Sequence, residues 1–168
     1  MVRDTEPKTE YGGGMNKIYY FTGSGNSLAI AQRVAEKTEE CELIRVTSKT
    51  DCETPVTAEI LGFVFPVYAW GMPLLFKEFL TKLQIQQAEY VFVITNYGGN
   101  CGNVMGLFNK IMTKKGRRID AFGEVVMPSN YVMMGDASSE HKAANILQIA
   151  ETGLENSLPT LLTVKNCR

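Results

Sequence analysis

The sequence predicts an α/β fold: a doubly wound, five-stranded parallel sheet with helices on both faces. Two observations support this prediction. From Met15 onward, short apolar runs alternate with segments whose apolar residues recur at helical spacing, which is the order of successive βαβ units. Each apolar run is five to seven residues long and rich in Ile, Val, Phe and Tyr, as expected for strands buried on both faces.

The individual elements follow from the same pattern. The predicted strands are Lys17–Phe21, Glu42–Val46, Glu59–Phe65, Tyr90–Asn96 and Ala121–Met127. The predicted helices are Asn26–Thr38, Met72–Leu83, Cys101–Lys115 and Ser138–Leu154. The connection TSKTDCETPVTA (47–58) shows no helical stripe, so we expect an irregular loop or a very short helix there.

Composition limits the classes of partner. The 168 residues carry a net charge of -1, so a nucleic-acid surface or a polybasic membrane patch is not expected. No apolar run reaches the roughly 18 residues of a membrane span. The four cysteines are scattered without C-x-x-C spacing, which favours free thiols in a reducing, cytoplasmic compartment over a disulfide framework or a metal site.

One domain accounts for most of the chain. Residues 1–14 are charged, lack periodicity and end in three glycines, so we expect a disordered leader or cloning remnant. The domain itself is predicted over residues 15–158. Residues 159–168 would then be a C-terminal tail, which could also begin a linker to a further domain.

The segment TGSGNS, which joins the first predicted strand to the first helix, resembles a phosphate cradle. Glycines at 23 and 25 allow a concave arrangement of backbone amides, and the unpaired N–H groups of a helix N-terminus favour an anion. The lysine of a P-loop and the third glycine of a dinucleotide fingerprint are both missing. Ser24 also lacks the glycines of a nucleophile elbow.

Two later loops are predicted at the same edge of the sheet. FPVYAWGMP (65–73) places Tyr68 and the single tryptophan, Trp70, between two prolines. TNYGGNCGN (95–103) surrounds Tyr97 with glycines and amides, which is richer than helix capping requires. These loops can hold a flat ring system, although a lone tryptophan packed over the sheet edge as core is the alternative for Trp70.

The loops FTGSGNS, FPVYAWGMP, TNYGGNCGN and MPSNYVMMG, in this order, resemble the flavodoxin-like half of flavodoxin/ferredoxin fusion proteins. The resemblance covers Met15 to about Leu158 and implies a flavodoxin-like fold with strand order 2-1-3-4-5 and bound FMN. By motif, it implies a phosphate site and two segments that flank the isoalloxazine. The phosphate residues would be Thr22, Gly23, Ser24, Gly25, Asn26 and Ser27. The flanking residues would be Pro66, Val67, Tyr68, Ala69, Trp70 and Gly71 on one side, with Thr95, Asn96, Tyr97, Gly98, Gly99 and Asn100 on the other.

The resemblance also bears on partners. Fusion members continue into iron–sulfur motifs, whereas this sequence ends at LLTVKNCR with Cys167 alone. The ferredoxin half is therefore absent from these residues or the protein is a stand-alone relative. In both cases the redox partner, a separate protein or a ferredoxin-like iron–sulfur domain, lies outside the chain.

The leading functional hypothesis is an FMN electron-transfer protein, either a one-electron carrier or the flavin module of a larger oxidoreductase. An electron-transfer oxidoreductase module is favoured over a stand-alone catalyst, and the question of enzymatic activity stays open here. Two alternatives remain open at this point: a serine hydrolase using Ser24 with His141 as base, and a cofactor-free interaction module. Cys101 is expected to pack as the first residue of its helix. Asp136 and Glu140 fit either an acidic docking surface or ordinary surface charge.

Overall fold

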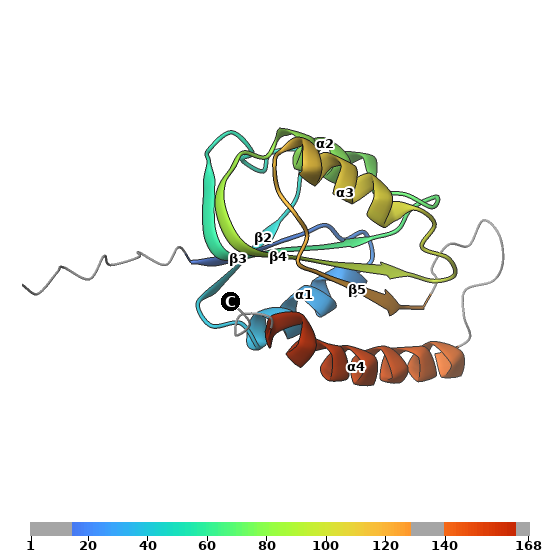
Figure 1. Cartoon of the computed structure of the whole chain (residues 1–168). Coiled ribbons are helices and arrows are strands. Elements are labelled where there is room, and N and C mark those ends of the chain that lie inside the picture. The colour runs from blue at the N-terminus through green and yellow to red at the C-terminus, as the bar shows by residue number, and fades with distance from the viewer. Residues whose placement is uncertain (1–14, 129–139, 164–168) are drawn as a thin grey trace, which may run out of the picture.

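A computed structural model describes residues 15–128 and 140–163. Its centre is a five-stranded, all-parallel sheet in the order β2-β1-β3-β4-β5, which confirms the predicted order (Figure 1). The strands are β1 (Asn16–Tyr20), β2 (Cys41–Arg45), β3 (Val56–Pro66), β4 (Ile85–Tyr97) and β5 (Ala121–Val126).

Helices cover both faces of the sheet. One face carries α1 (Asn26–Glu36) and α4 (Glu140–Thr163), and the other carries α2 (Leu74–Lys82) and α3 (Val104–Lys114) (Figure 1). The connection between β2 and β3 contains no helix, in agreement with the missing stripe in its sequence. Among the helices of the described ranges, none combines the length and apolar character needed to span a membrane.

Two hydrophobic clusters hold the layers together. Under α2 and α3 the sheet is packed largely with aromatic rings, including the fully buried Phe63, Phe65, Phe76 and Phe108. Under α1 and α4 the cluster is mainly aliphatic and includes Ile18, Ile30 and Val64. Because β1, β3 and β4 are buried on both faces, their carboxyl ends are held in fixed positions by packing.

The central strands are longer than the sequence predicts. β3 begins at Val56 instead of Glu59, and β4 begins at Ile85 instead of Tyr90. These early residues pair only with each other, through a register shift at Val56/Thr57, and several of them are exposed. Strand pairing at the rim does not need the continuous apolar run that marks a buried strand.

Helix boundaries also differ from prediction, most of all at the start of α3 and the end of α4. α3 begins at Val104 and not at Cys101, because Gly102 adopts a left-handed conformation with φ 59°. α4 continues to Thr163 and does not end at Leu154. Asp136 and most of the MPSNYVMMG loop lie outside the described residues.

Candidate functional site

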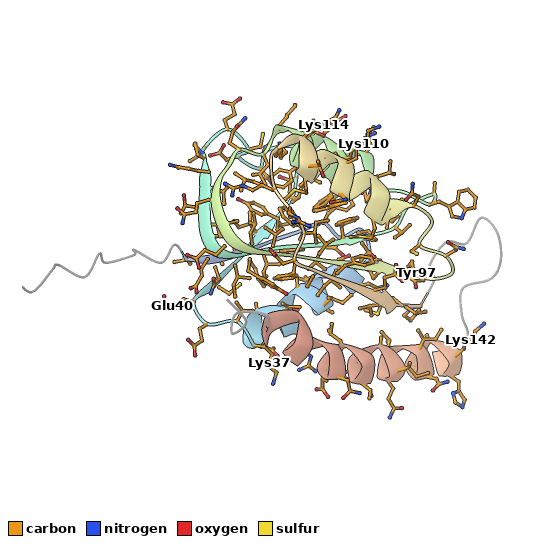
Figure 2. All side chains as sticks on the ribbon, viewed as in Figure 1. Lys37, Glu40, Tyr97, Lys110, Lys114 and Lys142 are labelled. Atoms are coloured by element: carbon orange, nitrogen blue, oxygen red, sulfur yellow. The ribbon has the colours of Figure 1, made fainter. Side chains whose placement is uncertain are left out.

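The three predicted site loops meet at the carboxyl edge of the sheet. They follow β1, β3 and β4, which are neighbours in the sheet order. The Phe21 N–H donates to the Val64 carbonyl at 2.9 Å, and the Val67 N–H donates to the Asn96 carbonyl at 2.8 Å. Figure 2 shows Tyr97 at this edge, where β4 ends.

The first loop leads into an open helix N-terminus. Gly25 caps α1 in a left-handed conformation, with φ 101°, and its N–H donates to Thr22 Oγ1 at 2.9 Å. No side chain caps this end of α1, and its first turn contains no acidic residue. A Cβ added to Gly25 would meet nothing within 4 Å. The first backbone N–H groups of α1 can therefore donate hydrogen bonds to an anion without displacing a side chain.

Asn26 and Ser27 use their side chains inside the fold. The buried Ser27 hydroxyl accepts a hydrogen bond from Asn96 Nδ2 at 2.6 Å, which joins α1 to the end of β4. Asn26 Nδ2 donates to the Pro128 carbonyl at 3.5 Å. Within the predicted cradle, Ser24 is exposed, whereas Thr22 is half-buried and its hydroxyl oxygen accepts the Gly25 N–H. Ser27 can contribute its backbone N–H to an anion site, but not a hydroxyl turned toward solvent.

The second loop is a tight hairpin-like turn. Tyr68 and Gly71 exchange two backbone hydrogen bonds of 2.9 Å, and both intervening residues have positive φ, 47° at Ala69 and 59° at Trp70. Such conformations cost a non-glycine residue about 1–3 kcal/mol and are concentrated at functional sites. Trp70 is 67% exposed, so it is not a core residue, and Tyr68 is 48% exposed.

Two glycines allow this turn to approach its neighbours. A Cβ on Gly23 would lie 2.4 Å from the Tyr68 hydroxyl, so Tyr68 reaches the cradle of the first loop. A Cβ on Gly102 would lie 2.6 Å from Trp70 Cβ, so the third loop packs directly against the tryptophan. The loops thus form one connected edge.

The third loop is held by an acidic residue from β5. Tyr97 donates its hydroxyl proton to Glu124 Oε2 at 3.2 Å. A hydrogen bond to the same carboxylate raises the pKa of the Cys101 thiol. The pKa of Tyr97 is also raised, chiefly by burial and to a smaller extent by the negative charge of Glu124. Cys101 therefore lies three residues before α3, beside a carboxylate, and not at the first position of the helix.

The tip of this loop is open. Gly98, Gly99 and Asn100 are exposed, and a Cβ on Gly99 would meet nothing within 4 Å. At the first position of the loop, Thr95 Oγ1 is buried and has no hydrogen-bond partner within the described residues. The site thus offers exposed backbone groups to a ligand, and it contains one unsatisfied buried hydroxyl.

Three residues that complete this edge were missed by sequence reasoning: Gly102, Glu124 and Pro128. Glu124 stands inside an apolar strand, AFGEVV, and an acid at such a position is a usable signal. Gly102 and Pro128 carry no distinguishing signal, because their roles depend on Trp70 and Asn26, which are distant in sequence.

The hydrolase alternative gains no geometric support. His141 is exposed at the start of α4, and within the described residues no hydrogen bond joins it to Ser24. Likewise, no group of three potential metal ligands occurs among the described side chains.

Comparison with known proteins gives a consistent result. The family model described as Flavodoxin domain matches residues 17–123. No curated protein matches the sequence significantly.

Among solved structures, oxidised flavodoxin 1 from Bacillus cereus is similar, with a TM-score of 0.55 at 14% sequence identity. The alignment covers 84% of this chain and 98% of that flavodoxin. A flavodoxin from the domain Archaea gives 0.53 at 16% identity, with 84% and 98% covered. A variant flavodoxin from Fusobacterium nucleatum, bound to flavin mononucleotide, gives 0.51 at 16% identity, with 85% and 96% covered.

Proposed function

Since the chain belongs to the flavodoxin-domain family, we propose that it binds FMN and carries single electrons between partner proteins, alone or as the flavin module of a larger oxidoreductase. Family membership and the fold support a flavin-binding, electron-transfer role at the coarse level. The choice of FMN agrees with the flavin mononucleotide bound to one of the similar flavodoxins. An iron–sulfur protein or domain outside this chain is the proposed redox partner.

The observation that carries the proposal is the open N-terminus of α1. A phosphate needs several donors that are not already paired within the protein, and the amides after Gly25 meet this need. In the proposal, the phosphate is held by backbone and hydroxyl groups of residues 22–27. Ser24 contributes its hydroxyl, while Ser27 contributes its backbone amide because its hydroxyl is bonded to Asn96.

The ring is assigned to the space bordered by residues 66–71 and 95–100. Trp70 provides an exposed aromatic face on a turn that the two Tyr68–Gly71 hydrogen bonds close. The exposed peptides of Gly98 and Gly99 provide hydrogen-bonding groups for the polar edge of a flavin. Thr95 Oγ1 is a further unused group on this side.

Bound FMN supplies one-electron redox chemistry, and the protein sets its potential. Residues 22–27, 66–71 and 95–103 contain no lysine or arginine, and Glu124 adds a negative charge to the third loop. These groups disfavour negative charge added to the ring. If the site binds the oxidised flavin ten times more tightly than the reduced flavin, the one-electron potential falls by about 59 mV, so we expect a low reduction potential.

The test compares FMN with riboflavin in titrations of the apoprotein, followed by flavin fluorescence. If the amides of α1 hold the phosphate, riboflavin should bind at least about 100-fold more weakly, since charge-assisted hydrogen bonds are lost. Equal affinity for the two flavins would contradict the phosphate assignment, and no binding of either would contradict the proposed function.

A matched pair of variants tests the position of the phosphate. Gly25→Ala and Gly116→Ala both place a methyl at a left-handed glycine, with φ 101° and 70°, and neither Cβ meets an atom within 4 Å. Their effects on stability should therefore be similar. Only Gly25→Ala should weaken FMN binding, while its effect on riboflavin should be smaller.

A further inference from the structure

The helices on the two faces of the sheet differ in charge. Residues 74–82 and 104–118, which contain α2 and α3, carry seven basic side chains and one acidic side chain, Glu78. Residues 26–40 and 141–156, on the α1 and α4 face, carry three basic and five acidic side chains. A net charge of -1 for the whole chain conceals this separation.

Most of the basic side chains near α2 and α3 are exposed. Lys115 donates to the carbonyls of Thr81 and Leu83 at 2.7 and 2.9 Å, and Arg117 donates to the carbonyl of Gln86. The other five are exposed, and none of them forms an ion pair within the described part of the chain: Lys77, Lys82, Lys110, Lys114 and Arg118. Unpaired like charges on one face create a field that attracts anionic groups.

The basic residues continue directly from an exposed apolar patch beside the candidate site. Trp70 and Leu74 are 67% and 70% exposed, and Leu107 is 39% exposed. Leu107 Cδ1 would lie 3.7 Å from a Cβ on Gly71, so the patch bridges the second loop and α3. On each helix a lysine follows three residues after the exposed leucine, Lys77 on α2 and Lys110 on α3, and Lys114 continues the stripe.

We propose that Trp70, Leu74, Lys77, Leu107, Lys110 and Lys114, here called the α2–α3 surface, dock a redox protein with an acidic face. The inference rests on the proposed FMN function, because that function brings an electron partner to this edge of the sheet. The apolar residues form the centre of the contact and the lysines form its rim. This places the docking charge on the basic face, away from Glu140 and the α4 helix.

A protein fits this surface better than a membrane or a nucleic acid. The lysines follow the exposed leucines on both helices, so an apolar patch adjoins charged side chains, as in a small transient interface with a polar rim. The lysines steer the partner, and the apolar centre brings it close to the proposed ring position.

The experiment measures binding of an oxidised, acidic [2Fe–2S] ferredoxin to the FMN-loaded chain by calorimetry. At about 20 mM NaCl, Lys110→Glu combined with Lys114→Glu should weaken binding about tenfold or more. The matched control is Lys37→Glu with Lys142→Glu, two exposed lysines on the opposite face, which should change binding less than about twofold (Figure 2). Circular dichroism confirms that the variants remain folded.

Further measurements define the outcomes. Binding by the unaltered chain should weaken steeply between about 20 and 300 mM NaCl, and basic cytochrome c should bind more weakly than the ferredoxin at low salt. Absence of ferredoxin binding, equal effects of the two double variants, preference for cytochrome c, or tighter binding to phosphatidylserine vesicles or a DNA duplex would each overturn the proposal. Repeating the titration without FMN separates the hypotheses. If the chain docks the ferredoxin in a charge-dependent way but cannot bind FMN, the docking surface is supported and the proposed function is contradicted. If it binds FMN without such docking, the proposed function is supported and the docking surface is contradicted.

Discussion

The two faces of the sheet are packed in different ways. Under α2 and α3, aromatic rings interlock: Phe65 stacks on Phe76 with centroids 4.3 Å apart and on Phe108 at 5.8 Å. Under α1 and α4, a groove of about 440 Å³ remains between the helices, lined by Ile30, Met127, Leu147 and Ala150 among others. One face is tightly filled, and the other leaves room.

This difference concerns the ring side of the proposed site, because the phosphate side lies at the N-terminus of α1 on the other face. The aromatic core lies under the helices that follow the Trp70 turn and the third loop, so the strained turn rests on a rigid support. α4 contributes only Ala150 and Leu154 to the buried set of described residues. The loops that border the proposed ring position therefore have dense packing beneath them.

The largest expected effect is loss of a ring from the aromatic face. Phe76 is fully buried and contacts Phe63, Phe65 and Phe79. Phe76→Ala should reduce the free energy of unfolding by about 3–5 kcal/mol, because the neighbouring rings cannot close the cavity.

The comparison variant is Leu154→Ala, on the other face beside the groove. This substitution should reduce the free energy of unfolding by about 2 kcal/mol, the lower end for a buried leucine, because Leu154 already borders the open groove. Urea unfolding followed by circular dichroism measures both variants. A larger loss for Leu154→Ala than for Phe76→Ala would show that the packing contrast has no energetic meaning.

A smaller effect should come from adding a methyl where β3 and β4 touch. A Cβ on Gly62 would lie 2.2 Å from Phe92 Cζ, and Phe92 is fully buried. Gly62→Ala should therefore destabilise the protein by about 1–3 kcal/mol, although Gly→Ala without a clash is usually stabilising.

A second substitution checks the cause. In the background of Phe92→Leu, Gly62→Ala should cost less, because the ring that meets the new methyl is gone. Denaturant midpoints of the four proteins give the coupling energy. Equal costs in both backgrounds would assign the effect to the backbone and not to the ring.

The groove should tolerate the opposite change. Ala150 is 9% exposed and lines the groove, so Ala150→Leu can extend into free space. We expect the free energy of unfolding to change by less than about 1 kcal/mol, in contrast to Gly62→Ala on the tightly paired strands. A loss comparable to that of Gly62→Ala would mean that the groove closes around Ala150 in solution.

The sequence was sufficient for the element order, because buried parallel strands and amphipathic helices have different periods. It was not sufficient where contacts between distant segments decide the result. The rim of β4 pairs through polar residues such as Gln87, and the Ser27 hydroxyl turns inward because Asn96 meets it there. The positions of the three predicted loops followed from strand order, whereas the contacts of Tyr68 with Gly23 and of Trp70 with Gly102 depend on how loops distant in sequence fold together.

The smallest expected effect concerns two thiols, one associated with each face. Burial, with a smaller contribution from Glu42, raises the pKa of Cys41 on the α1 and α4 face to about 11. The Glu124 carboxylate raises the pKa of Cys101 chiefly through a hydrogen bond. Because a carboxylate disfavours a neighbouring thiolate, Glu124→Gln should shift the alkylation of Cys101 by iodoacetamide to lower pH and leave that of Cys41 unchanged.

Mass spectrometry of the alkylated peptides across a pH series resolves the two sites. A parallel shift at both thiols would point to a global change in the fold, and no shift at Cys101 would show that Glu124 holds the third loop through Tyr97 alone.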